Sequence, residues 1–422
     1  MVRIAVFCAV PFAGNTGMVT VDLAALSILR RLAPDAEITL YTFAALPGQT
    51  HSKSLPFEYL TLETDGDSYF SSDIFIFWGD FAHSRSYLTF DRGVIAGRLS
   101  TATPDTNDSQ YQQHFADFAK YLFLTELPDA KRRSSLVFGS TIITNTATDD
   151  QDELYANCFR EFFSNVKAVY FRDAISAAKI SPLRGAEATL GCDCALLLED
   201  EDLNQLHGFK MAELRRGVGV FFGRSPHKLR MMLFSRAVGM ALGEKCRWIH
   251  WLPWDLSKWK RLQCRWFGYE VREGAEEPGV LLSQLSSCKY VVTDTYHVCV
   301  NAWRLGIPAV CIGEGGKMPW NSISDKKKEV LYSMYGASAF YIFNEQLGSP
   351  RSFAGAVRRA VKVLRDTSLV ACVRSNIREH VAMALGRLRT ALRSLIADSH
   401  PNATDLESSD EMYASATSNG EI

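Results

Sequence analysis

One stretch in the C-terminal third of the chain combines residues that could do chemistry with a pattern that would position them. A short apolar run at 290–292 is followed by Thr293-Asp294-Thr295 and then by His297. Thr and Asp side chains are favoured where a helix begins. The first turn of a helix offers backbone N–H groups and the positive end of its dipole to an anion. The stretch therefore predicts a histidine beside an anion site.

The residues after His297 predict the elements that hold it. Apolar residues at helical spacing run from 298 to 305, and Gly306 then ends the helix. Residues 307–312 form a second apolar run. We expect strand, polar turn, helix and strand in this order, with His297 in the first helical turn. Histidine suits proton transfer because its unperturbed pKa lies near neutrality.

Length and composition limit the class of protein. The chain has 422 residues, of which 47% are hydrophobic and 22% charged, so we expect a globular protein of two domains. A formal net charge of −1 argues against a bulk nucleic-acid binder. No stretch approaches the roughly 20 apolar residues of a membrane span. Ten cysteines lie mostly in apolar runs, which favours buried free thiols in a reducing cytoplasm over disulfides.

The first half of the chain alternates strand and helix patterns. A strand at 3–9, a glycine-containing turn at 11–17, a helix at 19–32 and a strand at 36–42 form a βαβ unit, which implies a parallel sheet. Further strands are expected at 168–173 and 189–198, with a strand ending in a turn at 72–80 and a strand running into a loop at 135–143. Helices are expected at 111–123, 152–165 and from 174 to 180. Cys192 and Cys194 flank Asp193, and without a second cysteine pair this spacing favours a strand over a metal site.

A polar and charged segment at 199–216 marks a domain boundary, after which the pattern starts again. Strands are expected at 217–223 and 247–252 and helices at 229–243 and 279–286. The predicted fold class is α/β, with two Rossmann-like domains whose strand ends face a cleft and with a helical segment at the C-terminal end. The domains are predicted at 1–205 and 206–350, followed by closing helices at 351–397 and a disordered acidic tail at 398–422.

The closing helices are basic and carry one apolar stripe, formed by Leu385, Leu388, Leu392 and Leu395. The favoured interpretation is a packed helix with a solvated charged face. The alternative is peripheral contact with an anionic membrane. Both interpretations agree with a cytoplasmic protein. Membrane contact would place the protein at the inner face of the membrane.

Several segments, in order over residues 2–345, resemble the polysaccharide pyruvyl transferases. They are Gly14-Asn15-Thr16-Gly17 after the first strand, the strand before Gly79, Arg172-Asp173-Ala-Ile-Ser176, Asp193 where the family has Asp-Pro-Ala, and Thr293 to His297 with Gly306, Pro308 and Lys317. The sequence departs from the family at three positions, which are Met18 in place of Asp, Cys194 in place of Pro, and Thr295 in place of an arginine found in many members.

The resemblance implies a fold like that of the GT-B glycosyltransferases and phosphoenolpyruvate as the donor. The product would be a pyruvate ketal on a sugar of a polysaccharide or of its lipid-linked precursor. The sequence has no metal-ligand spacing, so no metal is expected, and no cofactor or nucleic acid is expected either. His297 would protonate the donor. The donor would be bound by Arg224, Thr295, Lys317 and Asp294. Thr295 would bind the donor's anionic groups more weakly than an arginine, because it lacks the bidentate guanidinium. Arg172 and Asp173 are expected to form a structural ion pair at a strand end.

The acceptor side is predicted from the first domain and from a tryptophan-rich segment. Asn15 and Asp80 follow strands of the first domain. Five of the eight tryptophans fall within 248–266, and aromatic faces stack on sugar rings. Trp251 and Trp254 are expected to contact the sugar. The two outer tryptophans, Trp248 and Trp266, are expected in the core.

Two other functions stay open. A nucleotide-sugar glycosyltransferase of the same architecture would need an acidic residue for the donor ribose, a role that Glu314 could fill. A non-catalytic relative that binds glycans would fit the altered Met18 and Thr295.

Overall fold

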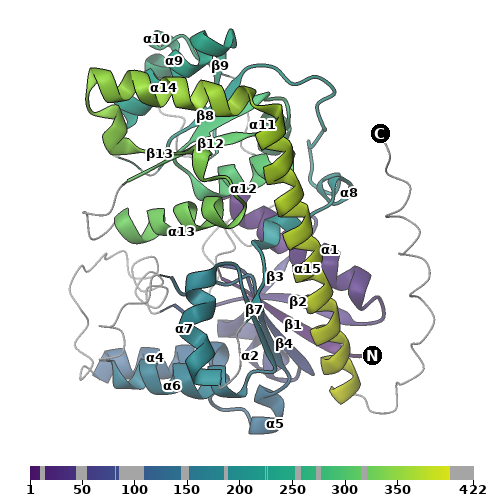
Figure 1. Ribbon diagram of the computed structural model, residues 1–422. Helices are drawn as coiled ribbons and strands as arrows, with labels where there is room; N and C mark the ends of the chain where they lie inside the picture. The colour runs from purple at the N-terminus through teal and green to yellow at the C-terminus, as the bar shows by residue number, and fades with distance from the viewer. Residues whose placement is uncertain are drawn as a thin grey trace.

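The computed structural model describes residues 1–9, 15–43, 55–80, 82–84, 109–143, 152–184, 189–223, 225, 227–251, 258–271, 277–314 and 321–399. In these residues the chain forms two parallel sheets, one above the other in Figure 1, with helices packed around them. The expected positions at Arg224, Lys317 and Trp254 and the acidic tail from 400 lie outside the described residues.

The first sheet has seven strands in the order β3-β2-β1-β4-β5-β6-β7, and every recorded pairing is parallel. Strands buried on both faces read as continuous apolar runs, and Ile-Phe-Ile-Phe-Trp in β4 is buried throughout. The strands are β1 (Arg3–Cys8), β2 (Glu37–Thr42), β3 (Tyr59–Thr61), β4 (Ile74–Trp78), β5 (Ser135–Phe138), β6 (Ala168–Phe171) and β7 (Thr189–Leu190). The helices of this part are α1 (Thr16–Leu32), α2 (Leu62–Phe70), α4 (Ser109–Leu122), α5 (Asp129–Arg132), α6 (Glu153–Asn165), α7 (Ala174–Arg184), the 3-10 helix η2 (Cys194–Leu197) and α8 (Asp200–Leu203).

The second sheet has six parallel strands in the order β10-β9-β8-β11-β12-β13. They are β8 (Val218–Phe221), β9 (Cys246–Trp248), β10 (Glu270–Val271), β11 (Tyr290–Thr293), β12 (Ala309–Gly313) and β13 (Tyr341–Phe343). The helices are α9 (Lys228–Leu242), α10 (Lys258–Trp266), α11 (Pro278–Ser286), α12 (Tyr296–Arg304), α13 (Asn321–Met334), η4 (Ser338–Phe340), η5 (Asn344–Leu347), α14 (Pro350–Arg365) and α15 (Thr367–Ser399). The expected strand, turn, helix and strand around His297 are therefore present as β11, α12 and β12.

Each sheet contains one point where the strand order reverses. The reversal lies between β1 and β4 in the first sheet and between β8 and β11 in the second. In open α/β sheets, ligands bind beyond the carboxyl ends of the strands at such a point. Because α1 follows β1 and α12 follows β11, the amino ends of these two helices mark the two reversal points.

Helix α15 runs along both sheets and closes the fold (Figure 1). Asn376 donates to the carbonyl of Tyr335 in the second part, whereas Arg387 donates to the carbonyl of Leu190 in the first, at 2.6 Å. Three leucines of its apolar stripe, Leu388, Leu392 and Leu395, are buried. The packed interpretation of the closing helix is confirmed, and its apolar stripe is used in that packing.

Two expectations about local structure are wrong. Residues 189–198 form only the short β7 and then η2, because the Asp193 carboxylate accepts from the backbone N–H of Ala195 at 3.1 Å and begins a 3-10 turn. Trp266 is 84% exposed, whereas Trp248 is buried as expected. The tryptophan at 266 ends the short helix α10, which projects that ring outward.

The ten cysteines are all free thiols, and eight of them are buried. No helix in the described parts of the chain is both long and apolar enough to pass through a membrane.

Asp22 of α1 gives the fold a predicted dependence on pH. Burial raises the pKa of its carboxyl from 3.8 to about 7, although the hydroxyl of Tyr59 donates to it at 2.6 Å. The native state keeps this proton up to about pH 7, whereas the unfolded chain releases it above about pH 4, so stability is lost as the pH rises through this interval.

We expect the free energy of unfolding to fall by about 3 kcal/mol more between about pH 5 and pH 8 in the wild type than in Asp22→Asn. Urea unfolding of both proteins at the two pH values measures this difference. Asp35→Asn, at an exposed aspartate, is the matched control and should follow the wild type. Parallel pH profiles for Asp22→Asn and the wild type would contradict the assignment.

Candidate active site

The amino end of α12 meets the amino end of α1, so the two reversal points of the sheets come together. A Cβ atom on Gly17 would lie 2.3 Å from the Cβ of His297, and only glycine permits this approach. His297 is 6% exposed. Where the sequence predicts a cleft, the two sides are thus in contact at Gly17 and His297. The histidine is enclosed between two helix amino ends.

A second contact behind His297 holds the two helices in this arrangement. The side-chain amide of Asn301 donates to the carbonyl of His297 at 2.9 Å and to the hydroxyl of Thr20 in α1 at 3.2 Å. Asn301 is fully buried. The backbone that carries the histidine is therefore tied to the opposite sheet's first helix.

Asp294 fixes the loop that follows β8. Its two carboxylate oxygens accept from the backbone N–H groups of Gly223 and Ser225, at 2.9 and 2.8 Å. The hydroxyl of Thr295 also donates to this carboxylate, at 2.9 Å. Asp294 thereby anchors the backbone at residues 223 and 225.

Thr295 is the N-cap residue of α12, as the sequence indicates, but its side chain makes no capping hydrogen bond to the helix. The hydroxyl is turned toward Asp294 instead. The helix begins where the sequence predicts, but the Thr295 hydroxyl is hydrogen-bonded to Asp294 and not to the first turn of the helix.

Two cations from different parts of the chain lie over the ring of Tyr296. The guanidinium carbon of Arg172 is 4.8 Å from the ring centroid, and the ammonium nitrogen of Lys327 is 5.1 Å from it. The ring of Tyr296 in turn packs edge-on against His297, with 5.3 Å between the ring centroids. Cations over an aromatic face are attracted by its quadrupole, so positive charge gathers beside the first turn of α12.

Arg172 is held by two carboxylates of the first sheet. It contacts Asp193 at 3.2 Å and Asp80 at 3.5 Å, and its side chain is 2% exposed. Burial opposes the charged guanidinium, but Tyr296 and the carboxylates of Asp193, Asp80 and Asp173 together raise its pKa. The expected ion pair with Asp173 is absent from the recorded contacts of the described residues. Asp173 accepts from the N–H and hydroxyl of Ser176 instead, because it begins α7.

Two buried lysines of α13 were not predicted. Lys328 donates to the backbone carbonyl of Asp294 at 2.8 Å, and the neighbouring Lys327 reaches Tyr296. Their exposed fractions are 2% and 7%. The run of three lysines at 326–328 was the available signal, but such a run usually marks a solvated face.

The predicted acceptor residues are distributed unevenly around this centre. Asn15 is the N-cap residue of α1, next to the contact with His297, and makes no side-chain capping bond. Asp80 belongs to the Arg172 cluster and has a positive φ of 38°, which is unusual for a residue other than glycine. Trp251 is 1% exposed, and its role in sugar contact has no support from the structure because a stacking ring must be accessible.

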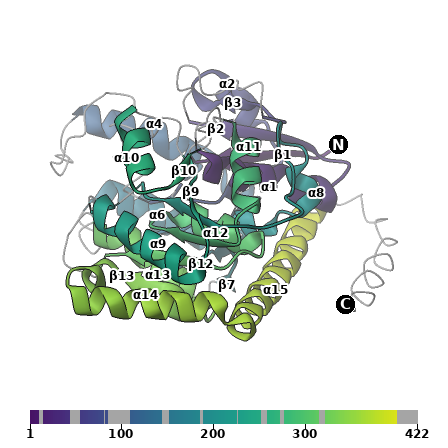
Figure 2. The ribbon, with the colours of Figure 1, turned by 90° about the horizontal axis from the view of Figure 1, so that it is seen from above.

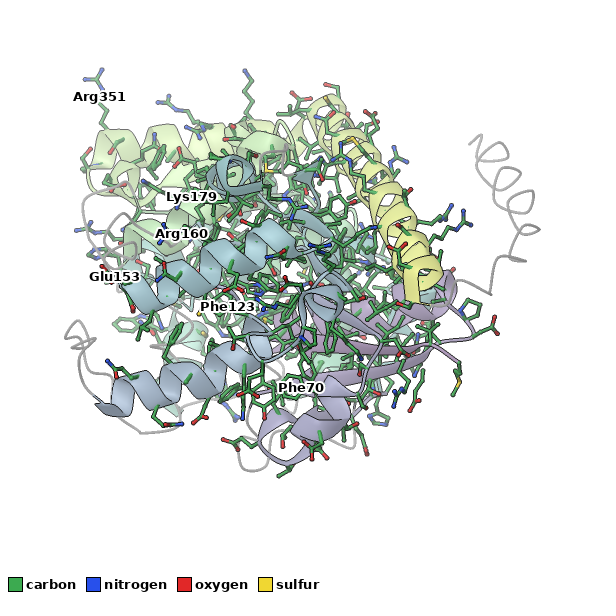
Figure 3. All side chains as sticks on the ribbon, turned by 90° about the horizontal axis from the view of Figure 1, so that it is seen from below. Phe70, Phe123, Glu153, Arg160, Lys179 and Arg351 are labelled. Carbon is green, nitrogen blue, oxygen red and sulfur yellow. The ribbon has the colours of Figure 1, made fainter. Side chains whose placement is uncertain are left out.

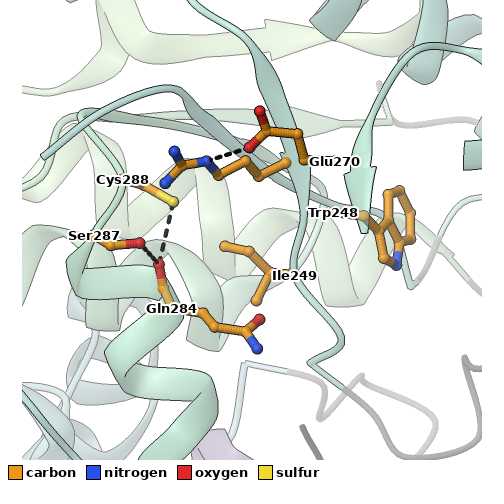
Figure 4. A pocket seen from close by; sticks show the side chains of 7 residues that line it. Trp248, Ile249, Glu270, Gln284, Ser287 and Cys288 are labelled. Carbon is orange, nitrogen blue, oxygen red and sulfur yellow. Dashed lines mark hydrogen bonds and ion pairs between the residues drawn. The ribbon is translucent and has the colours of Figure 1, made fainter. Parts of the chain in front are cut away.

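A small hollow elsewhere in the second sheet is separate from this site (Figure 4). Cys288 in its lining precedes β11, whereas His297 follows β11, so the two lie beyond opposite ends of one strand. An ion pair between Arg247 and Glu270 crosses the hollow at 2.9 Å. The full lining is Arg247, Trp248, Ile249, Glu270, Gln284, Ser287 and Cys288.

The described residues contain no group of three or more His, Cys, Asp or Glu side chains arranged to hold a metal ion. Cys192 and Cys194 are buried, and burial raises the pKa of both thiols well above the usual value. Neutral thiols are poor nucleophiles and poor metal ligands. The described groups of this site that could act on a ligand are His297, the cations near Tyr296 and the amino ends of α1 and α12.

A family model described as "Polysaccharide pyruvyl transferase" matches residues 23–316, which is more than half of the chain. The chain belongs to this family. The match makes it a transferase of the pyruvyl class and includes Arg172, Asp193 and His297. No curated protein matches the sequence.

Solved structures of sugar-nucleotide enzymes share the fold. A structure described as a UDP-N-acetylglucosamine 2-epimerase from Listeria monocytogenes is 10% identical, covers 94% of this chain and 96% of its own, and has a TM-score of 0.54. The S. aureus MnaA–UDP structure is 9% identical, with coverage of 94% and 97% and a TM-score of 0.52. UDP-GlcNAc 2-epimerase from Neisseria meningitidis bound to UDP-GlcNAc is 8% identical, with coverage of 93% and 100% and a TM-score of 0.50. The predicted GT-B-like α/β architecture is confirmed, and at such identities the likeness concerns the fold alone.

Proposed function

We propose that this pyruvyl transferase moves pyruvate from phosphoenolpyruvate onto two hydroxyls of one sugar, in a polysaccharide or in its lipid-linked precursor. The observation that carries the proposal is the position of His297, in the first turn of α12 and enclosed against Gly17 of α1. A proton donor and two helix amino ends thus share one small volume. Phosphoenolpyruvate needs both, because it must be protonated and carries two anionic groups.

The proposed reaction assigns one proton transfer to His297. The imidazolium gives a proton to the methylene carbon of the donor, and C2 becomes electrophilic. One sugar hydroxyl attacks C2, and phosphate leaves as its bond to C2 breaks. A second hydroxyl then closes the ketal, and the hydroxyl protons pass to the base and to phosphate. The net products are a pyruvate ketal and inorganic phosphate.

The negative charges of phosphoenolpyruvate require cations. We assign these cations to the second domain. Arg224 and Lys317 remain the proposed ligands of the phosphate and carboxylate, with Thr295 and the amino end of α12 beside them. Asp294 anchors Gly223 and Ser225, which flank Arg224 in the sequence, and this supports assigning the donor to the segment after β8. Lys327, near Tyr296, is a further source of positive charge where the family's arginine is replaced by Thr295.

We assign the acceptor to the first domain, residues 1–205, and the donor to the second, residues 206–350. Asn15 supports this division because it lies at the amino end of α1, next to the histidine contact. Asp80 and Trp254 complete the proposed acceptor side, and a cytoplasmic location would supply phosphoenolpyruvate.

The decisive experiment incubates the full chain with phosphoenolpyruvate and a panel of free and lipid-linked sugars. We expect phosphate release and a product whose mass has gained one pyruvic acid less one water. Phosphoenolpyruvate should also raise the melting temperature of the protein. Stabilisation by nucleotide sugars with transfer of a glycosyl group would contradict the proposal, and so would phosphate release without a ketal product.

A further inference from the structure

Three helices of the second domain differ from the rest of the chain in charge. Helices α9, α10 and α14 contain twelve Lys and Arg residues and no Asp or Glu. The whole chain, by contrast, has 46 basic and 47 acidic residues. Because these three helices carry basic residues without acidic ones, they produce a local positive electrostatic field although the net charge of the chain is close to zero.

The basic side chains of α14 point to one side. Arg351, Arg358, Lys362 and Arg365 are separated by seven, four and three residues, a spacing that places them on one helical face, and all four are exposed. Arg359, one position away, turns inward and donates to the carbonyls of Ala339 and Tyr341. Figure 3 shows Arg351 extending away from the body of the molecule.

Large apolar side chains are exposed among these charges. Of eleven well-exposed large apolar side chains in the described parts of the chain, five lie in α9 and α10. They are Leu229 (54% exposed), Leu233 (47%), Met240 (67%), Leu262 (59%) and Trp266 (84%). Leu229 and Leu233, like Leu262 and Trp266, are four residues apart and so share a helical face. Single exposed apolar side chains are common, but five on two helices form a surface that a binding partner would explain.

The three helices lie at one end of the molecule. Arg365 donates to the carbonyl of Ala241 at 2.8 Å, which joins the last turns of α14 and α9. Figures 1 and 2 show α9, α10 and α14 at the end of the second domain remote from the first sheet. This face is thus separate from the contact between Gly17 and His297, so its occupation can be tested apart from catalysis.

We propose that this face, formed by α9, α10 and α14, docks on a membrane surface that contains anionic phospholipids. Arginines and lysines would contact the phosphate groups, while Trp266 and the exposed leucines would enter the boundary between headgroups and acyl chains. A nucleic acid would satisfy the positive charge but would leave the aliphatic side chains of α9 in water. The apolar stripe of α15 is buried, so it is not available to a membrane. The docking surface proposed here therefore does not include that stripe, although the basic sequence of the closing helices suggests it.

The first test is flotation of the full chain with vesicles. We expect binding to phosphatidylcholine vesicles that contain phosphatidylglycerol, little binding to phosphatidylcholine alone, and release by high salt. Arg358→Glu with Lys362→Glu should reduce the partition coefficient roughly 100-fold or more. Arg30→Glu with Arg378→Glu makes the same charge change at exposed positions of α1 and α15 and should bind as the wild type does.

The second test separates insertion from simple charge attraction. Binding should shift tryptophan emission to shorter wavelength, and Trp266→Phe should lose most of that shift while keeping its melting temperature. Leu233→Ser with Leu262→Ser should weaken binding without changing its salt dependence. An absence of binding to anionic vesicles, equal loss in the control pair, or tighter binding to RNA than to vesicles in a mobility-shift assay would each overturn the inference. Ketal formation on a soluble sugar does not need this face, so it should survive every one of these variants.

Discussion

Replacing His297 with alanine is expected to lower the rate of phosphate release from phosphoenolpyruvate by roughly 10²- to 10⁴-fold, the usual contribution of a general acid. The fold should survive, because alanine keeps the Cβ of His297, which of the His297 atoms comes nearest to Gly17. The hydrogen bond from Asn301 also goes to the backbone carbonyl at 297, which the substitution leaves in place. A coupled phosphate assay with the sugar acceptor measures the loss, and a thermal melt checks the fold.

The matched control for that experiment is His207→Ala. His207 is an exposed histidine that pairs with Glu277, in the second part of the chain and away from α12. It should retain the wild-type rate. Full activity in His297→Ala would refute the proposed proton transfer, and an equal loss in both variants would point to a general effect on folding.

Most strands and helices could be predicted because local sequence alone determines them. The run at 290–293, the helix from 296 and the strand at 309–313 agree with the expected pattern within a few residues. Buried parallel strands read as unbroken apolar runs, and glycine ends helices, as Gly306 does with a positive φ of 71°. The failures have local causes too. Asp193 starts a 3-10 turn within an apolar run that otherwise reads as a strand.

The candidate site was only partly predictable, because its geometry depends on contacts between distant residues. His297 and the polar turn before it are recognisable from residue type and position. Gly17 meets His297 across 280 positions of sequence, and no local pattern records that approach. Asp173 adjoins Arg172 in sequence and looked like its partner, but the partners are Asp193 and Asp80. Consecutive side chains at the end of a strand point to opposite faces of the sheet, so neighbours in sequence are poorly placed to form an ion pair.

The two sheets join through the same polar cluster that faces the first turn of α12. Arg172 connects carboxylates of the first sheet to Tyr296 of the second, and Tyr296 packs on His297. Arg172 thus contacts the first sheet's carboxylates and the ring that packs on the histidine. We therefore predict that Arg172 positions Tyr296 in addition to stabilising the fold.

Replacing Arg172 with leucine is expected to lower the free energy of unfolding by about 3–5 kcal/mol, because removal of one partner leaves buried carboxylates without a counter-charge. Asp193 is 0% and Asp80 9% exposed at the side chain, so water does not replace the guanidinium. Urea unfolding measures the loss. Arg132→Leu is the matched control, since Arg132 also contacts two carboxylates, those of Asp129 and Glu161, but these are more than half exposed. Its loss should be about 1 kcal/mol or less.

A second substitution separates the charge effect from lost packing. Adding Asp193→Asn to Arg172→Leu removes one of the uncompensated charges, and the asparagine oxygen can still accept from the N–H of Ala195. The double variant should therefore be more stable than Arg172→Leu alone, which is non-additive behaviour expected of residues in contact. Additive losses would mean that Arg172 acts through packing only. Arg172→Lys keeps the charge but loses the planar fork, so it should recover part of the stability. If Arg172 also positions Tyr296, Arg172→Lys should still show a lower kcat than the wild type under conditions where both proteins are fully folded.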